Sequence, residues 1–309
     1  MQSSVLVTGA SSGIGCAICK RLTEKGIFVF AGIKTLSKSE DFKGVITQTK
    51  NFATIHLDVT EEDSIIKAVE KINETLREKN LIFSGVVNNA ADENLGPVEI
   101  LPVEVFRHEM EVGYLGTVAV SKAFIPLLRK YRGRIINISS MNGRFSFKNH
   151  STSCATKYAV EAFSDSLRME LKRWGVHVVI VEPGLVDTDL MKGKTINEFK
   201  VKIPRYKGNK AFDLYFPNHE KTVQNVEEYV RDAENHPKNA WQKLSLLMRG
   251  QWWLLAPDDI AKIVEKGLCK KRPKTRYLVG IQANWWYFLR CILADRWFDY
   301  FVAEHEFDF

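Results

Sequence analysis

The sequence lacks the features of a secreted or membrane-spanning protein. No window reaches about 18 consecutive uncharged apolar residues, so no conventional transmembrane helix is expected. The first residues pass from MQSS directly into the apolar run VLVTG, without a charged segment before it, and no cleaved secretory signal is expected. Cysteines number only five, an odd count that favours a reducing compartment over a disulfide framework.

A paired set of metal-binding cysteines is also missing. Cys16 and Cys19 have the C-x-x-C spacing, which could be redox-active or metal-binding. No second pair accompanies them, and they lie where the first helix is expected. We therefore interpret them as packing residues and expect no metal site.

Concentrated positive charge is missing too. The net charge is +7, but the 44 lysines and arginines are interspersed with 37 acidic residues. Residues 268–277 form the one basic cluster. Without a recognised reading module, charge alone is a weak signal, so no nucleic-acid partner is expected.

What the chain does contain is a regular alternation of apolar runs and helical segments. The apolar runs are residues 4–9, 27–32, 52–59, 83–90, 133–140 and 176–184, and the helical segments are 14–25, 61–78, 104–130 and 153–174. Runs this apolar are typical of strands buried on both faces by helices. The pattern predicts an α/β fold with a doubly wound parallel sheet of the Rossmann type, whose strand carboxyl ends share one edge.

We expect a single domain, because no linker, repeat or low-complexity tract is present. Residues 1–189 would form the dinucleotide-binding core. Residues 190–255, rich in lysine and aromatics, have a composition suited to a lid over an apolar ligand, although ordinary packing would look similar. Residues 256–309 would supply a last helix, a last strand at 276–280 and an aromatic C-terminal helical extension.

The glycine-rich segment TGASSGIG (8–15) follows the first expected strand and opens the first expected helix. Its glycines allow a tight turn and the close approach of a pyrophosphate to the helix N-terminus, where free N–H groups favour negative charge. In this strand–loop–helix context the segment predicts a dinucleotide site.

Further segments follow in the order typical of one family: LDVT (57–60), NNA (88–90), NISS (137–140), Lys157 and PGLVDT (183–188). Together with the glycine loop they resemble the short-chain dehydrogenase/reductase superfamily. The segment KYAVEAFSDSLRMEL, with VVIVEPG and the late PKTRYLVG, looks like the branch that handles hydroxysteroids, retinoids and similar lipophilic alcohols. The resemblance implies a nicotinamide dinucleotide and a lipophilic small-molecule ligand.

The resemblance assigns cofactor contacts position by position. The glycine loop would hold the pyrophosphate and ribose, Asp58 and Val59 would flank the adenine, and the backbone after Pro183 with Thr188 would fix the carboxamide. The expected cofactor residues are Gly9, Ser11, Ser12, Gly13, Ile14, Gly15, Lys34, Asp58, Val59, Asn89, Ala90, Lys157, Pro183, Gly184 and Thr188. Relatives that use NAD often carry an acid where Ile33 stands. Lys34 follows instead, so NADP(H) is favoured over NAD(H), although a lone lysine could equally be a solvated loop charge.

The catalytic positions depart from the family. There, a serine orients the substrate carbonyl, a tyrosine transfers the proton and a lysine four residues later lowers the pKa of that tyrosine. Ser140 and Lys157 match, but Ser153 stands where tyrosine is expected. A serine hydroxyl is a far weaker acid than a phenol of pKa about 10, and it reaches less far. We expect Ser140, Ser153 and Lys157 to be the catalytic residues, with a water near Ser153 supplying the proton slowly.

Two further positions differ from the family. Ala91 replaces the glycine that normally follows NNA, and Gly113 stands where an asparagine would anchor a relay water. Tyr158 is not expected to replace the missing tyrosine, because it lies about 100° around the helix from Lys157. These differences suggest a chain released from the usual proton relay.

The segment 284–302, NWWYFLRCILADRWFDYFV, places its apolar residues near one helical stripe and its charged residues off it. The stripe could pack over the substrate site or against another subunit, or it could dock on a membrane surface. By analogy with the family we expect a homo-oligomer. We expect a cytoplasmic location, with membrane contact through this segment as the alternative.

Two functions remain open from the sequence. The first is an NADP(H)-linked oxidoreductase of a lipophilic alcohol or ketone, with impaired or atypical catalysis. The second is a catalytically degenerate dinucleotide-binding sensor or scaffold, or a non-redox isomerase or lyase on the same scaffold. The family resemblance favours the first, and the altered proton relay favours the second, so the sequence does not decide whether the chain is an active enzyme.

Overall fold

The computed structural model of the protein describes residues 1–35, 42, 51–188, 198–234 and 254–305. Within them a seven-stranded sheet has the order β3-β2-β1-β4-β5-β6-β7, with every neighbouring pair parallel. The strands are β1 (Gln2–Thr8), β2 (Phe28–Ile33), β3 (Phe52–His56), β4 (Leu81–Asn88), β5 (Arg134–Ile138), β6 (His177–Pro183) and β7 (Arg276–Val279). This confirms the expected doubly wound parallel sheet.

The helices that cover the sheet match the expected segments closely. They are α1 (Gly13–Glu24), α3 (Glu62–Glu78), α4 (Val103–Met110), α5 (Gly116–Tyr131), α6 (Ser151–Leu171) and α11 (Pro257–Cys269). Further helices are α8 (Phe212–Tyr215), α9 (His219–Glu234), α12 (Ile281–Ile292) and α13 (Asp295–His305). Short π-helical turns are η2 (Glu111–Leu115) and η6 (Glu198–Lys202), and short 3₁₀ turns are η3 (Met141–Gly143), η4 (Lys172–Trp174) and η7 (Ile203–Tyr206).

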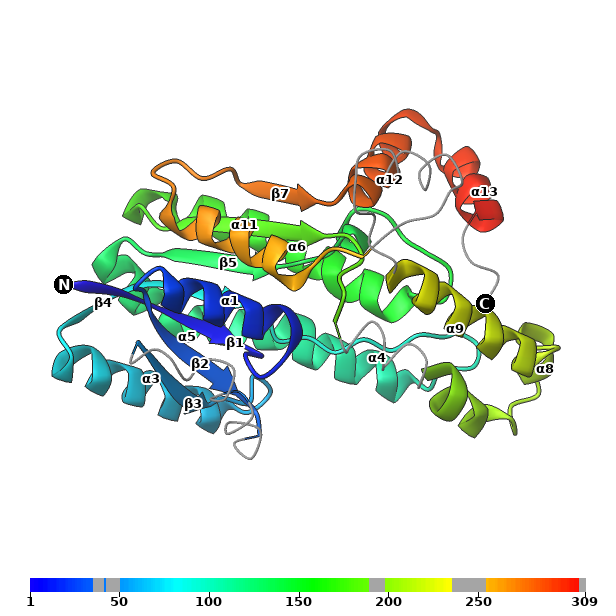
Figure 1. The fold of residues 1–309 in the computed structure, drawn as a ribbon, viewed down its shortest axis with the longest axis horizontal. Coiled ribbons are helices and arrows are strands. Elements are labelled where there is room, and N and C mark those ends of the chain that lie inside the picture. Colours follow the sequence, from blue (N-terminus) through cyan, green and yellow to red (C-terminus); the bar gives the residue numbers. More distant parts are fainter. Residues whose placement is uncertain (36–41, 43–50, 189–197, 235–253, 306–309) are drawn as a thin grey trace.

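The alternation of side chains along each strand builds a core on both faces of the sheet. On β1, Val5 and Val7 join the cluster that α1 and α11 cover, whereas Leu6 joins the cluster that α3, α5 and α6 cover. In Figure 1 the strand arrows point toward the end of the molecule where α4, α9, α12 and α13 lie. The strand order reverses between β1 and β4, and in such sheets ligands bind outside the carboxyl ends at this point.

One helix among the described residues is long and apolar enough to cross a membrane by length and composition. It is the continuous Val103–Tyr131 helix of 29 residues, with a mean hydropathy of 1.2 and 44% of the tested window buried. Val120, Phe124 and Leu128 on this helix are fully buried in the core beneath the sheet. The same composition is therefore explained by a core helix.

Beyond the strand ends, residues 198–226 pack on the loop that precedes α4. Ile203, Phe212 and Val226 share a small buried cluster with Leu95 and Leu101. Residues 190–197 and 235–253 of the expected lid lie outside the described residues, so the lid and the domain boundaries remain predictions.

The single helical stripe expected over 284–302 is wrong. The segment forms two helices, because Leu293 ends α12 in an extended conformation (φ −95°, ψ 137°) and the Ala294 carbonyl begins α13. The break allows Trp286 of α12 and Phe298 of α13 to enter the same buried cluster, with ring centroids 6.3 Å apart. In one straight helix these two residues, twelve positions apart, would be more than three turns apart along the axis, and their rings could not meet.

Candidate active site

The glycine loop between β1 and α1 is built for close backbone approach. Gly9 (φ +61°) and Gly13 (φ +50°) adopt the left-handed region that favours glycine. A Cβ on Gly15 would lie 2.2 Å from the carbonyl oxygen of Gly9, so any side chain there would force the loop off the helix. Ser12, in extended backbone, precedes the first turn of α1, and its carbonyl accepts from the Cys16 N–H. The loop therefore leaves the N–H groups at the N-terminus of α1 uncovered by side chains of its own glycines.

The end of β4 is joined directly to this loop. The Asn89 side-chain amide donates to the carbonyls of Thr8 (3.0 Å) and Gly9 (3.1 Å). In return the Thr8 hydroxyl oxygen accepts from the N–H groups of Asn89 and Ala90, both at 3.0 Å. The expected cofactor residues Gly9, Asn89 and Ala90 thus lie together at the point where the strand order reverses.

The segment after β6 also reaches the loop. A Cβ on Gly13 would lie 3.2 Å from Cγ2 of Thr188. The Gly184 N–H donates to the Val279 carbonyl of β7 at 2.9 Å, which holds the chain after Pro183 at the sheet edge. Thr188 is consequently beside the N-terminus of α1, and its role at the carboxamide stays a prediction.

Asp58 and Val59, which are expected near the adenine, differ in their surroundings: Asp58 is in a polar group and Val59 is in the core. The Lys34 ammonium lies 2.8 Å from Asp58 Oδ2, and the Thr60 hydroxyl donates to Asp58 Oδ1 at 2.7 Å. Partial burial alone would raise the pKa of the Asp58 carboxyl, but the Lys34 and Thr60 bonds bring that pKa below its ordinary value. Val59 is buried against Gly116, whose Cβ would lie 2.6 Å from Val59 Cγ2. Its side chain is therefore part of the core and not of an adenine contact surface.

Ser140 and Ser153 are linked through one residue. The Ser140 hydroxyl oxygen accepts from the Asn142 N–H at 3.1 Å and caps the η3 turn. The Asn142 side-chain amide donates to the buried Ser153 hydroxyl at 3.4 Å. The structure therefore brings together two of the expected catalytic residues, and Asn142 is a partner that the sequence analysis did not identify.

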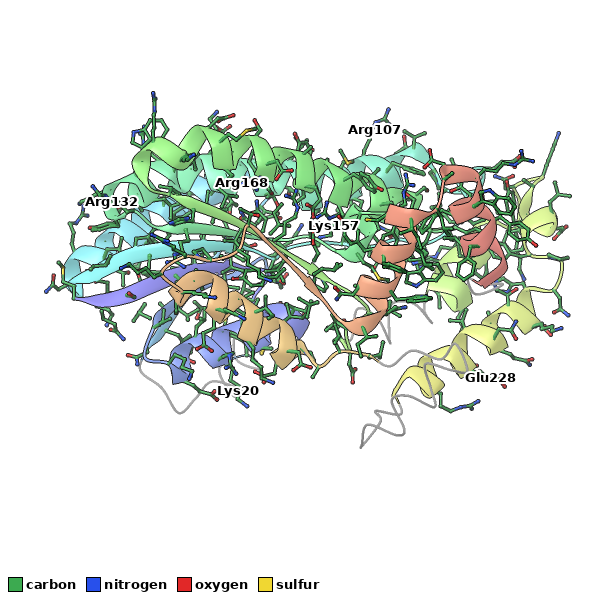
Figure 2. The ribbon with its side chains drawn as sticks, turned by 90° about the horizontal axis from the view of Figure 1, so that it is seen from above. Lys20, Arg107, Arg132, Lys157, Arg168 and Glu228 are labelled. Carbon is green, nitrogen blue, oxygen red and sulfur yellow. The ribbon has the colours of Figure 1, made fainter. Side chains whose placement is uncertain are left out.

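Lys157 lies in the interior near the ends of the strands (Figure 2) and donates from Nζ to the Ile138 carbonyl at 3.0 Å. Burial lowers the pKa of its ammonium, while the charges of Glu93, Glu109 and Glu161 oppose that shift. The carbonyl bond fixes the ammonium at the carboxyl end of β5. Lys157 thus joins Ser153, one turn earlier on α6, at the same edge of the sheet.

The positions that depart from the family differ in their surroundings. Gly113 is buried in η2, and a Cβ there would lie 2.5 Å from Cγ2 of Thr156 on α6. Ala91 is exposed, so its methyl group is not packed against the described chain. Tyr158 is 43% exposed, which agrees with the expectation that it faces away from Lys157. The space at Gly113 that a larger side chain would need is filled by the Thr156 methyl.

Glu109 is a buried carboxyl that the sequence analysis missed. It is 1% exposed on α4, and its Oε2 accepts from the N–H (3.0 Å) and the side-chain amide (3.3 Å) of Asn94. Burial, followed by the negative charge of Glu93, raises the pKa of Glu109 to about 7. A buried carboxyl with a raised pKa, whose negative charge acts on Lys157, is a candidate for acid–base chemistry.

A second group of charges lies behind the Ser140 turn. Arg144 Nε is 2.7 Å and Arg276 Nε 3.3 Å from Glu182 Oε1, and Arg276 Nη2 also reaches Glu161 and Asp165. Burial, followed by the charge of Glu161, raises the pKa of Glu182 to about 7. These residues tie the Ser140 turn to α6, β6 and β7, which gives them a structural role.

Comparison with known proteins agrees with this geometry. The family model described as short chain dehydrogenase matches residues 3–198. The mitochondrial D-beta-hydroxybutyrate dehydrogenase of Bos taurus is 41% identical over 185 residues, covering 59% of this chain and 54% of that protein, so the chain spans about half of it. Retinol dehydrogenase 16 of Rattus norvegicus is 31% identical over 299 residues, covering 95% of this chain and 87% of that protein.

A solved structure is similar across nearly the whole fold. The short-chain dehydrogenase from Streptomyces avermitilis superposes with a TM-score of 0.70 at 24% identity, covering 94% of this chain and 92% of that one. At this level of identity the likeness concerns the fold.

Proposed function

Because the chain belongs to the short chain dehydrogenase family, we propose that it is a nicotinamide-dinucleotide-linked oxidoreductase of a lipophilic alcohol or ketone. A retinoid or steroid is the substrate class that the branch resemblance and the retinol dehydrogenase relative support. The observation that carries the proposal is the cradle formed by Gly9, Gly15 and Asn89 at the reversal of strand order. The cradle leaves the N-terminus of α1 free of side chains at the position where dinucleotide pyrophosphates bind in such sheets.

The described residues fit a dinucleotide. The free N–H groups at the start of α1 would bind the pyrophosphate, with Gly9 and Gly13 allowing it close. Asp58 would bind at the adenine end, and Thr188 with the backbone after Pro183 would hold the carboxamide. When bound, the dinucleotide supplies or accepts a hydride. The chain's own residues then have to bind and orient the substrate oxygen and move one proton.

NADP(H) is the proposed form of the cofactor. Position 33 is a buried isoleucine and cannot accept ribose hydroxyls, while the Lys34 side chain is 64% exposed on the same strand end. Lys34 bridges to Asp58, so a 2′-phosphate would compete with that carboxylate for the ammonium. Calorimetry should show tighter binding of NADPH than of NADH, and Lys34→Glu should erase or reverse the preference. Equal affinities in the wild type would overturn the assignment.

Proton transfer is the weak step of the proposed reaction. The hydroxyls of Ser140 and Ser153 can orient a carbonyl oxygen, but neither is acidic enough to give a proton readily at neutral pH. Lys157 would hold the ribose and place a positive charge near the oxygen. The experiment is stopped-flow measurement of NADPH oxidation with a panel of lipophilic ketones that includes a keto-steroid and retinal. Hydride transfer to at least one of them is expected, at a low rate.

A second function is favoured by one contact. The Thr156 methyl fills the space beside Gly113, where the family's water-anchoring side chain would stand. A chain that binds the dinucleotide without turning it over, as a sensor or scaffold, or as a non-redox isomerase or lyase, would have no need of that water. Tight NADPH binding with no hydride transfer to any ketone in the panel would favour this alternative.

We also propose that α12 and α13 contact a membrane surface. Trp285, Phe288, Ile292 and Trp297 are each at least 44% exposed on these two helices. Aromatic side chains on an interfacial helix favour the lipid headgroup boundary. Co-sedimentation with phosphatidylcholine vesicles should be lost when Trp285, Phe288 and Trp297 become serine, but not in Leu214→Ser, which changes an exposed leucine elsewhere. A loss of dimer instead would assign the patch to a homo-oligomer interface.

A further inference from the structure

Exposed positive charge gathers at the end of the molecule where the strands begin. Residues 129–134, 172–177 and 270–276 lead into β5, β6 and β7, which are neighbours in the sheet. These three segments contain no aspartate or glutamate. Nine of their lysines and arginines are exposed, and together they form the basic edge: Arg129, Lys130, Arg132, Lys172, Arg173, Lys270, Lys271, Arg272 and Lys274.

Contacts join the segments that lead into β5 and β6. The guanidinium carbons of Arg129 and Arg173 lie 5.1 Å and 4.0 Å from the centre of the Trp174 ring. Cδ of Arg132 would lie 3.7 Å from a Cβ on Gly175, the residue after this tryptophan. Arginines that are far apart in the sequence therefore surround one aromatic ring.

The segment that leads into β7 continues the same edge. The Thr275 carbonyl accepts from the Ile180 N–H of β6 at 2.9 Å, which holds this segment beside its neighbour. Figure 2 shows Arg132 at one end of the molecule, and α12 and α13 lie at the other. The basic edge is thus separate from the candidate active site and from the exposed aromatic side chains of the C-terminal helices.

The cations of the basic edge lack ion-pair partners. None of the nine forms an ion pair with a carboxylate in the part of the chain that the structure describes. Cations on other surfaces do form such pairs. Arg107 lies 2.9 Å from Glu104, and Lys262 lies 3.0 Å from both Asp258 and Asp259. The positive charge of the basic edge is therefore left uncompensated by its own chain.

The helix dipole explains only part of this charge. Arg129 and Lys130 lie in the last turn of α5, where cations are favoured. Residues 271–274 lie beyond the end of α11, and the effect of the dipole falls off outside the last turn. Arg132 has φ +52°, in the left-handed region where asparagine and glycine are usual. Helix geometry therefore does not select these cations.

The arginines on Trp174 are positioned to bind carboxylates. A guanidinium that lies over an aromatic ring loses little freedom when its planar N–H edge pairs with a carboxylate through two hydrogen bonds. The Lys130 ammonium also lies over a ring, 5.0 Å from the centre of Tyr131. Binders of single-stranded nucleic acid stack bases on open aromatic rings, and the rings here already carry cations.

We propose that the basic edge binds an acidic, extended segment of a partner protein. Neighbouring strands lie about 4.8 Å apart, so the outer two segments are about 10 Å apart, a distance that about three residues of extended chain span. Charges spread over three segments suit a chain with several carboxylates better than one small anion. A bilayer in contact with α12 and α13 would lie at the other end of the molecule, which leaves the basic edge to a soluble partner (Figure 1). This interaction does not depend on the oxidoreductase function.

The test is fluorescence anisotropy of a labelled peptide of about eight residues in which glutamate alternates with serine. The wild-type protein should bind it at about 0.05 M salt, and less tightly at about 0.15 M because salt screens the charges. The triple variant Arg129→Glu, Arg132→Glu and Arg173→Glu should lose at least about tenfold in affinity, because attraction becomes repulsion. Lysine at the same three positions keeps the charge without the planar fork and should lose about threefold.

The matched control is the triple variant Lys20→Glu, Lys67→Glu and Lys122→Glu, which changes three exposed lysines on α1, α3 and α5. It alters the net charge by the same amount and should bind the peptide within about twofold of the wild type. Circular dichroism should show that every variant is folded.

Three results would overturn the proposal. The first is no binding of the peptide by the wild type at the lower salt concentration. The second is an equal loss in the control and in the arginine-to-glutamate variant, because net charge alone would then explain the binding. The third is tighter binding of phosphatidylserine vesicles or of duplex RNA than of the peptide at about 0.15 M salt, which would assign the basic edge to that anion instead.

Discussion

Replacing Glu109 with glutamine should make the protein more stable than the wild type at alkaline pH. Glutamine has nearly the same shape, and its carbonyl oxygen can accept the two hydrogen bonds that Asn94 donates to Oε2. Its amide would take the place of the buried Oε1, and the Thr152 hydroxyl that contacts the Glu109 carboxyl lies nearby. The variant therefore removes a buried ionisable group while it keeps the contacts that hold the loop.

The magnitude follows from the pKa of Glu109, which rises from 4.5 to about 7 because the group is buried and lies near Glu93. Between these two values the unfolded chain loses its proton while the folded protein keeps it, so the free energy of unfolding of the wild type falls as pH rises. At about 1.36 kcal/mol per pKa unit, the loss is about 3 kcal/mol by the time both forms are ionised. At 1% exposure, solvent screens this cost little.

The assay is urea unfolding of wild type and Glu109→Gln at about pH 4.5 and at about pH 8.5, with Glu111→Gln as the control because Glu111 is an exposed carboxylate directly after α4. The glutamine variant should match the wild type at the acid pH and exceed it by about 3 kcal/mol at the alkaline pH, and the control should match the wild type at both. An equal free energy of unfolding for wild type and Glu109→Gln at alkaline pH would refute the reasoning. A gain of the same size at both pH values would show that packing, and not ionisation, is responsible.

Two further variants test the site by binding and by turnover. Gly15→Ala should abolish NADPH binding in calorimetry, because its Cβ would lie 2.2 Å from the Gly9 carbonyl oxygen, whereas Gly208→Ala, with nothing within 4 Å, should bind normally. The double variant Gly113→Asn with Ser153→Tyr should restore little ketone reduction, because the Thr156 methyl would lie 2.5 Å from the new Cβ at position 113. Adding Thr156→Ser removes that methyl, and the triple variant should reduce ketones at least about tenfold faster than the double variant. A double variant as fast as the triple would mean that α6 yields to the new side chain.

The strands were predictable because a parallel sheet covered on both faces leaves an almost continuous apolar run, as the fully buried β2 (Phe28–Ile33) illustrates. The C-terminal extension was not, because an apolar stripe has the same appearance in one straight helix and in two helices joined by a turn. The turn at Leu293 depends on where Trp286 and Phe298 can be buried together, which is a tertiary contact. The periodicity of the local sequence does not indicate this tertiary contact.

Within the site, the backbone cradle was predictable and the buried carboxyl was not. The role of Gly9, Gly13 and Gly15 depends on their having no side chain, and this property can be read directly from the sequence. Glu109 stands in VEVFRHEMEV, where acidic residues are typical of a solvated helix face. It is buried because the Asn94 loop and the start of α6 cover it. A helix-face analysis of α4 could have shown that it lies one turn before Gly113, but not that both face α6.

That shared face gives the departures at the site a common physical basis. Gly113 meets Thr156, and one turn earlier Glu109 meets Thr152, so the two contacts follow the same line between the Val103–Tyr131 helix and α6. At the first contact the Thr156 methyl fills the space where the family's water-anchoring side chain would stand. At the second contact the buried Glu109 carboxyl, whose pKa is raised, lies against α6. A phenol placed at 153 alone would still lack the water anchor, because the Thr156 methyl fills the space that a side chain at position 113 needs, so restoring activity should depend on changes across this helix contact.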